Sequence, residues 1–248
     1  MKISIAQIKP VKGDIAANIA AHISFIELAV THHADGIFFP ELSITGYEPE
    51  LANKLATTQG DTRFDIFQQT ADRHNISIGL GAPIRSAKGV LIGMIIFQPN
   101  QAKQTYCKQQ LHEDEFPYFV SGDKQLIIQL GELKIAPAIC YESLQENHAE
   151  AAHQLGAAIY IASVAKSQKG VDKAMIHYPA MAKKYAMPVM MCNCTGYCDN
   201  FEAVGKSAVW SPDGNLLAQL DEKPEGILIF DTVTAETNRA SLISSNRQ

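Results

Sequence analysis

Cys140 carries a thiol at the end of a short apolar stretch. Residues 133–139 read Leu-Lys-Ile-Ala-Pro-Ala-Ile, which predicts a strand, and residues 145–155 favour a helix. Such a strand–turn–helix corner holds a side chain out of a sheet and directs backbone N–H groups toward the group that it attacks. A lone cysteine is more often a small buried apolar residue, so a catalytic role needs support from other residues.

Glu41 and Lys108 supply that support, because each also ends a predicted strand, at 37–39 and 104–108. Ligands of open α/β sheets bind at the carboxyl ends of the strands. There a carboxylate can take the proton of a thiol, and an ammonium can stabilise the oxyanion that forms when the thiolate attacks a carbonyl. Singly, Glu41 could be a surface carboxylate and Lys108 a solvated strand end. Together with Cys140 they form a complete set that needs no metal or cofactor.

The elements that must position these residues alternate between strand and helix. Strands are predicted at residues 3–5, 37–39, 76–82, 91–97, 104–108, 125–130, 133–139, 157–163, 188–193, 206–210, 215–220 and 226–231. Helices are predicted at residues 15–30, 64–73, 145–155 and 172–185, with Pro179 expected to kink or divide the last one. The two α/β portions suggest a pseudo-repeat with two facing mixed sheets and helices outside. We expect one domain at residues 1–232 and a polar tail at 233–248, either an arm or disordered.

Composition excludes several classes of protein. Hydrophobic residues make up 46% of the 248 residues and charged residues 19%, which is typical of a globular protein with a sizeable core. The net charge of -5 argues against a nucleic-acid partner, because phosphate contacts need clustered Lys and Arg. No apolar run approaches the ~20 residues of a membrane helix, and residues 1–7 lack the features of a signal peptide. We therefore expect no membrane partner and a cytoplasmic location, with the five cysteines as reduced thiols.

The chain resembles the nitrilase superfamily of carbon–nitrogen hydrolases in its Glu, Lys and Cys motifs. These motifs are Phe39-Pro40-Glu41-Leu42 with Gly46-Tyr47, Tyr106-Cys107-Lys108, and Ile139-Cys140-Tyr141-Glu142. Later similar segments are Pro188-Val189, Asn193-Cys194-Thr195-Gly196, Phe201 with Gly205-Lys206-Ser207, and Pro212-Asp213-Gly214. They occur in the family's order between Ile3 and Asp231.

The resemblance implies a four-layer α-β-β-α sandwich, paired into a homodimer or higher homo-oligomer through its helical layer. It implies Cys140 as nucleophile, Glu41 as general base and Lys108 as oxyanion stabiliser. The backbone N–H of Tyr141 would be the second oxyanion donor. No metal or cofactor is implied.

A further glutamate usually follows the lysine in this family, and Glu115 is the best match, with Glu113 as the alternative. Further residues expected to contact substrate are Tyr47, Ser163 and Lys166. For Lys166 two interpretations remain open, a partner for a substrate carboxylate or a solvated surface lysine.

The motif Cys140-Tyr141-Glu142 resembles amidase-like and acyltransferase-like branches more than true nitrilases. We therefore expect hydrolysis of a small amide through a thioester, with an ω-amide of a dicarboxylic acid as an attractive substrate. One alternative is a soluble acyltransferase that passes the acyl group to an amine. Another is a binding or scaffold protein that does not use the three residues. The family's His-Leu pair after the lysine is displaced here to Leu111-His112, which leaves the shape of that loop open.

The remaining cysteines and histidines have simpler explanations. Cys107 is a rival nucleophile, but neighbours on a strand point to opposite faces, so Cys107 should face away if Lys108 faces the site. Cys192, Cys194 and Cys198 with His177 could suggest zinc, yet no second pair of ligands accompanies them. Surface or helix-end positions suffice for the other histidines, which are His22, His32, His33, His74, His148 and His153.

Overall fold

The computed structural model describes residues 1–58 and 60–242 and contains two large mixed sheets. The first has the order β15-β14-β1-β2-β3-β4-β5, with bounds Thr237–Ala240, Gly226–Asp231, Lys2–Gln7, Gly36–Phe38, Ser77–Ser86, Gly89–Phe97 and Gln104–Cys107. The second has the order β13-β12-β9-β8-β7-β6, with bounds Leu216–Gln219, Ala208–Trp210, Val189–Asn193, Ile159–Val164, Leu133–Ile139 and Ile128–Leu130. A separate hairpin pairs β10 (Thr195–Cys198) with β11 (Phe201–Val204).

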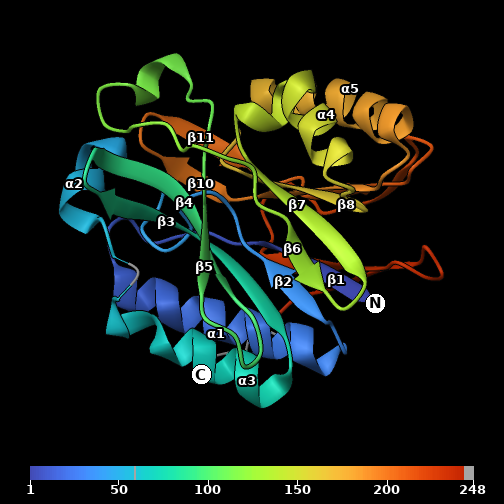
Figure 1. Cartoon of the computed structure of the whole chain (residues 1–248), viewed down its shortest axis with the longest axis horizontal. Helices are drawn as coiled ribbons and strands as arrows, with labels where there is room; N and C mark the ends of the chain where they lie inside the picture. Colours follow the sequence, from blue (N-terminus) through green and yellow to red (C-terminus); the bar gives the residue numbers. More distant parts are fainter. Residues whose placement is uncertain (59, 243–248) are drawn as a thin grey trace.

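Helices cover the outer face of each sheet, and the sheets pack face to face (Figure 1). The helices are α1 (Ile15–Thr31), α2 (Ala52–Leu55), α3 (Asp65–His74), α4 (Glu146–Gln154) and α5 (Gln168–Tyr185). One apolar cluster fills the space between the sheets, a second lies between the first sheet and α1 and α3, and a third between the second sheet and α4 and α5. The predicted α-β-β-α sandwich is confirmed. No helix in the described ranges is long and apolar enough to span a membrane.

The predicted pseudo-repeat is present in the strand directions. Strands β1, β2 and β3 run parallel, as do β7, β8 and β9, and the remaining pairs within the two sheets are antiparallel. Parallel strands place their carboxyl ends at one edge of a sheet. The fold therefore brings the residues that follow β2 and β7 toward one end of the sandwich.

Helix α1 illustrates how closely local signals match the fold. Asp14 accepts a hydrogen bond from the N–H of Ala17 (3.0 Å) and so caps the helix directly before its predicted start at residue 15. The apolar positions at helical spacing bury Phe25, Ile26 and Ala29 against the first sheet.

The last predicted helix differs in its start and in its continuity. Helix α5 starts at Gln168 and continues through Pro179 to Tyr185, so Pro179 does not divide it. A proline inside a helix removes one hydrogen bond, but α5 buries Tyr178 and Ala182 against the second sheet, and this packing outweighs the loss.

The predicted tail includes residues 237–240, which form strand β15 and pair antiparallel with β14, so this part of it is an ordered arm. A domain boundary at residue 232 stays a prediction, and residues 243–248 lie outside the described residues.

Candidate active site

The backbone turns sharply at Cys140. Strand β7 ends at Ile139, and Cys140 has a φ of 48°, in the left-handed region that non-glycine residues rarely adopt. The N–H of Cys140 donates to the carbonyl of Ser163 on β8 (3.0 Å), which fixes the turn. A 3-10 turn, η4 (Glu142–Leu144), then leads into α4. The predicted strand–turn–helix corner is therefore present.

Glu41 and Lys108 form an ion pair in the interior, with 2.9 Å between Oε1 and Nζ. Glu41 lies in the turn after β2, and Lys108 directly follows β5. Gly81 on β3 lets that turn approach, since a Cβ there would lie 2.4 Å from the carbonyl oxygen of Pro40. A second carboxylate, Glu115, places Oε1 2.6 Å from the same ammonium. All three charged side chains are buried.

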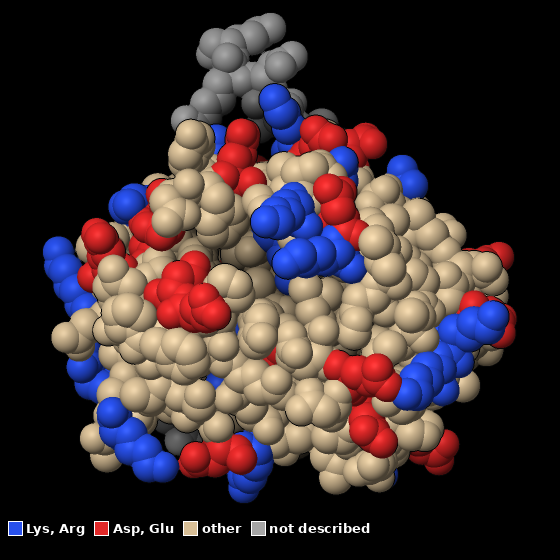
Figure 2. Space-filling model, turned by 90° about the horizontal axis from the view of Figure 1, so that it is seen from above, with Lys and Arg blue, Asp and Glu red and all other residues tan. Residues whose placement is uncertain are grey.

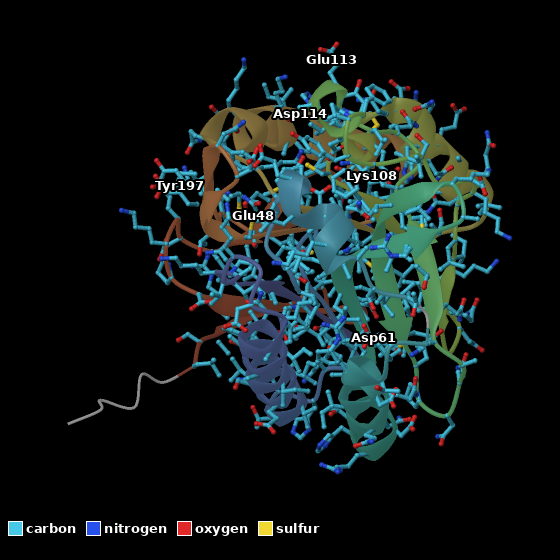
Figure 3. The ribbon with its side chains drawn as sticks, turned by 90° about the vertical axis from the view of Figure 1, so that its left-hand side faces the viewer. Glu48, Asp61, Lys108, Glu113, Asp114 and Tyr197 are labelled. Atoms are coloured by element: carbon cyan, nitrogen blue, oxygen red, sulfur yellow. The ribbon has the colours of Figure 1, made fainter. Side chains whose placement is uncertain are left out.

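The structure distinguishes between the two candidates for the second glutamate. Glu115 belongs to the 3-10 turn η3 (Glu113–Glu115), accepts a hydrogen bond from the hydroxyl of Tyr47 (3.0 Å) and one from the N–H of His112 (2.8 Å). Glu113 is exposed and points outward, whereas Lys108 lies inside the fold (Figure 3). Glu115 is therefore the glutamate that can act with Lys108, and Tyr47 helps to hold it.

Burial and charge set the protonation states of these groups. Burial raises the pKa of Glu41, and the ammonium of Lys108 opposes this rise. Burial favours the neutral amine of Lys108, but the negative charges of its neighbours outweigh this and raise its pKa. Burial, and then the charge of Glu41, raises the pKa of the Cys140 thiol to about 11, although Lys166 and Lys108 act in the opposite direction. The thiol therefore needs a base before it can attack.

Glu41 has an oxygen available for that task. Its Oε2 is buried and has no hydrogen-bond partner among the described residues. The nearby thiol of Cys140 lowers the pKa of Glu41. It does not form a hydrogen bond to Oε2, so this oxygen remains free to accept the thiol proton. A buried carboxylate with a raised pKa and a free acceptor is a suitable general base.

Cys140 opens onto a cavity of about 470 Å³ between the loop that carries η3 and the start of α5. Its lining residues include Tyr47, Asp114, Glu115, Tyr141, Lys166, Lys173, His177 and Phe201. Figure 2 shows this end of the molecule, where a hollow lies between a group of basic and a group of acidic side chains. The N–H of Tyr141 makes no hydrogen bond within the described residues, so it can donate to an oxyanion beside Cys140.

Two expectations for the pocket need correction. Ser163 does not line the cavity, since it is buried and its hydroxyl donates to the carbonyl of Phe39 (2.6 Å). The place of Ser163 at the end of a predicted strand suggested that its side chain would line the cavity. Its hydroxyl instead forms a hydrogen bond between the two sheets. Lys166 is not a solvated surface lysine, because it is 5% exposed and its Nζ lies 3.9 Å from Sγ of Cys140.

A buried polar network behind the corner was missed in the sequence. The carboxylate of Glu142 accepts hydrogen bonds from the hydroxyl of Tyr106 (2.6 Å) and from the N–H groups of Ile139 (2.8 Å) and Gln109 (2.6 Å). His148 is buried beside it and hydrogen-bonds to Tyr106 (2.8 Å). The network ties the end of β7, before Cys140, to the segment after Lys108. Its only sequence signal was an acidic residue two positions after Cys140.

The alternative sites are not supported. Cys107 lines a different cavity from Cys140, as the alternation along β5 predicts. No group of three or more potential metal ligands occurs in the described ranges, and Cys194 and Cys198 instead lie side by side (3.4 Å between the sulfurs). The expectation for the helical histidines is wrong for His22, which is buried and hydrogen-bonded to Ser43 (2.9 Å), and for His148.

Residues 2–242 match the family model for carbon–nitrogen hydrolases. The chain belongs to this family. The resemblance to the nitrilase superfamily, and with it the expectation of an enzyme that hydrolyses carbon–nitrogen bonds, is confirmed.

Relatives and solved structures agree with this assignment. The chain is 28% identical over 220 residues to 2-oxoglutaramate amidase of Bacillus subtilis (strain 168), covering 87% of this chain and 84% of the relative. It is 24% identical over 258 aligned positions to the glutamine-dependent NAD(+) synthetase of Thermotoga maritima, covering 100% of this chain but 45% of the relative. It thus spans less than half the length of that synthetase. An amidase from Nesterenkonia sp. AN1 has the same fold, with a TM-score of 0.86, 20% identity and 94% coverage of each chain.

Proposed function

We propose that this hydrolase cleaves a small amide through a thioester on Cys140. The observation that carries the proposal is the position of this thiol in a cavity wall, with the buried Glu41–Lys108–Glu115 group behind it. A thiol with a raised pKa, a carboxylate with a free oxygen and a fixed ammonium are the parts that nucleophilic acyl transfer needs.

The reaction follows from these positions. Glu41 takes the thiol proton, Sγ of Cys140 bonds to the amide carbon, and the carbonyl oxygen becomes an oxyanion. Lys108 uses two of its three N–H donors on Glu41 and Glu115, which leaves one for the oxyanion beside the N–H of Tyr141. Protonated Glu41 gives its proton to the departing amine as the carbon–nitrogen bond breaks. Water that loses a proton to Glu41 then hydrolyses the thioester and restores the thiol.

We further propose that the amide carries a carboxylate. Lys173 is exposed on the cavity wall formed by α5, where an anionic end of a substrate can pair with it. The relative that acts as 2-oxoglutaramate amidase supports an ω-amide of this kind. Two glutamine-dependent synthetases, which match over 100% and 98% of this chain, support glutamine, which has the same ω-amide and a carboxylate.

The test is ammonia release from a panel of ω-amides, neutral amides and nitriles. Cys140→Ala should reduce kcat by roughly 10³-fold or more, because no other thiol among the described residues lines the cavity and the thioester cannot form. Cys107→Ala is the matched control and should keep full activity, since Cys107 lies in another cavity. Release that survives in Cys140→Ala would exclude the thiol mechanism. Hydroxamate formation from hydroxylamine that outruns hydrolysis would favour the acyltransferase alternative, and an inactive wild type would favour a binding role.

The homo-oligomer and the cytoplasmic location expected from the sequence stay predictions. Sedimentation of the purified chain would measure the first.

A further inference from the structure

Lys166 is a buried lysine with an unusual partner. Its Nζ lies 3.9 Å from Sγ of Cys140, and no carboxylate pairs with it within residues 1–58 and 60–242, whereas Lys108 has two. A buried ammonium needs nearby negative charge to replace lost water. We propose that Lys166 is the counter-ion of the Cys140 thiolate, a second ammonium that serves the nucleophile alone.

The direction of this side chain is built into the fold. The N–H of Lys166 donates to Oδ1 of Asn193 (2.8 Å), and its carbonyl accepts from Nδ2 of the same residue (3.1 Å). Asn193 ends β9 and also donates to the carbonyl of Gly205 (2.7 Å). Gly170 in the first turn of α5 leaves room for the stem, since a Cβ there would lie 3.1 Å from Cβ of Lys166. The ammonium is thus held toward Cys140 before any substrate binds.

The charges around the sulfur balance only when Lys166 is counted. Once Glu41 has accepted the thiol proton, it is neutral. The thiolate and Glu115 then carry two negative charges, and Lys108 supplies one positive charge. Lys166 supplies the second. The transfer leaves this total unchanged, so the contribution of Lys166 is one of position: its Nζ lies 3.9 Å from Sγ and stabilises the negative charge when the charge moves from Glu41 to the sulfur.

His112, Asp114 and Lys173 line the same cavity as Cys140 and Lys166, and four further titratable groups near them are uncharged near neutral pH. Burial raises the pKa of Tyr47 and of Tyr178. The hydrogen bond with Cys198, followed by burial, raises the pKa of Cys194. Burial lowers the pKa of His177, which faces Lys166. The thiol therefore responds mainly to Glu41, Glu115, Lys108 and Lys166.

A substrate carboxylate is a less suitable partner for Lys166. The attacked carbon bonds to Sγ, so the reacting amide group itself occupies the space beside Nζ of Lys166. The carboxylate of an ω-amide lies several bonds farther away, where Lys173 lines the cavity. The inference rests on the proposed role of Cys140 as nucleophile, and it replaces the expected carboxylate contact of Lys166.

The test measures the pH dependence of Cys140 alkylation by iodoacetamide, read from the labelled peptide by mass spectrometry. We expect Lys166→Met to shift the profile upward by about one pH unit or more and to slow labelling at neutral pH by roughly 10-fold. Lys166→Arg keeps the charge and should remain near the wild type. Lys169→Met is the matched control, because Lys169 lies three residues further along, in the first turn of α5, where it is exposed and outside the cavity lining.

A Lys166→Met profile that superimposes on the wild type overturns the proposal. If this variant does not fold, Lys166→Gln replaces it, and the ratio of labelling by iodoacetate to labelling by iodoacetamide gives a second measure. The anionic reagent should lose its advantage in Lys166→Gln and keep it in Lys166→Arg; an equal ratio in both contradicts the proposal. This labelling test does not depend on amide hydrolysis. If the profile shifts but the protein hydrolyses no amide, the proposed function is wrong and the role of Lys166 stands.

Discussion

Nζ of Lys108 lies 2.6 Å from Oε1 of Glu115, although Glu115 sits in a loop that leaves the sheet directly after Lys108. The loop folds back, so the two residues meet in the interior where neither is accessible to solvent. Because Glu41 contacts the same nitrogen, Lys108 is held from two sides. These two contacts fix the direction of the remaining N–H of Lys108, which donates to the oxyanion.

Replacing Glu115 with Gln should therefore lower activity without preventing folding. The amide oxygen can still accept from Lys108, but the charge that fixes the ammonium is lost, so we expect kcat to fall by about 10- to 100-fold with a smaller change in KM. Glu113→Gln is the matched control, since Glu113 is exposed on the same turn and should leave kcat unchanged. Equal rates for both variants would show that Glu115 has no part in positioning Lys108.

The three residues at strand ends were predictable because the physical rule that places them is simple. Glu41, Lys108 and Cys140 each follow an apolar segment, and strand ends converge at one edge of the fold. The same rule was misleading for Ser163, whose hydroxyl turns into the core to bond Phe39. The sequence pattern shows that a residue lies at the end of a strand, but it does not show whether its side chain points into the cavity or into the core between the sheets.

Contacts that depend on tertiary packing could not be read from the sequence. The choice of Glu115 over Glu113 depends on how one loop folds back onto Lys108. The continuity of α5 through Pro179 depends on the packing of that helix on its sheet. The approach of Lys166 to Cys140 depends on Asn193, which lies on another strand.

Glu142 should give the stability of the protein a distinct pH dependence. Burial raises its pKa from 4.5 to about 7 in the folded state. Between these values the unfolded chain loses the proton and the folded chain keeps it, so the free energy of unfolding falls as pH rises. Relative to Glu142→Gln, the wild type should lose about 3 kcal/mol across this interval. Denaturant unfolding of both proteins at several pH values measures this difference.

The comparison with Glu142→Gln removes the contributions of groups that are not coupled to Glu142. Burial lowers the pKa of His148 to about 4 and that of His22 to about 4, so both favour unfolding as pH falls below 6.5, the opposite direction. His22 lies outside the Glu142 network and cancels in the difference, whereas His148, with Nε2 3.6 Å from Oε1 of Glu142, is coupled to Glu142 and contributes to it at the acid end of the interval. A difference that stays constant between pH 4.5 and 7 would mean that Glu142 is ionised throughout this range.

Ser163→Ala should affect stability more than substrate binding. The hydroxyl donates to the carbonyl of Phe39 across the two sheets, and its loss leaves that buried carbonyl with a weaker thiol contact from Cys192. We expect the free energy of unfolding to fall by about 1–2 kcal/mol. KM should not change, because Ser163 does not line the cavity. Ser24→Ala, which removes an exposed hydroxyl on α1, serves as control. A raised KM at unchanged stability would return Ser163 to the substrate site.

Lys173 should determine how strongly the site prefers anionic amides. Lys173 is exposed on the cavity wall, so an ion pair between it and a substrate carboxylate would be partly solvated. Lys173→Met should therefore raise KM for an ω-amide that carries a carboxylate by about 5- to 10-fold and leave kcat nearly unchanged. KM for a neutral amide of the same length should stay constant, because a neutral amide has no carboxylate to pair with Lys173. The effect should shrink at high salt, as a solvent-accessible ion pair requires. Lys169→Met, on the same helix but outside the cavity, controls for the change in net charge. Equal effects of Lys173→Met on charged and neutral amides would mean that this lysine shapes the cavity rather than pairing with a carboxylate.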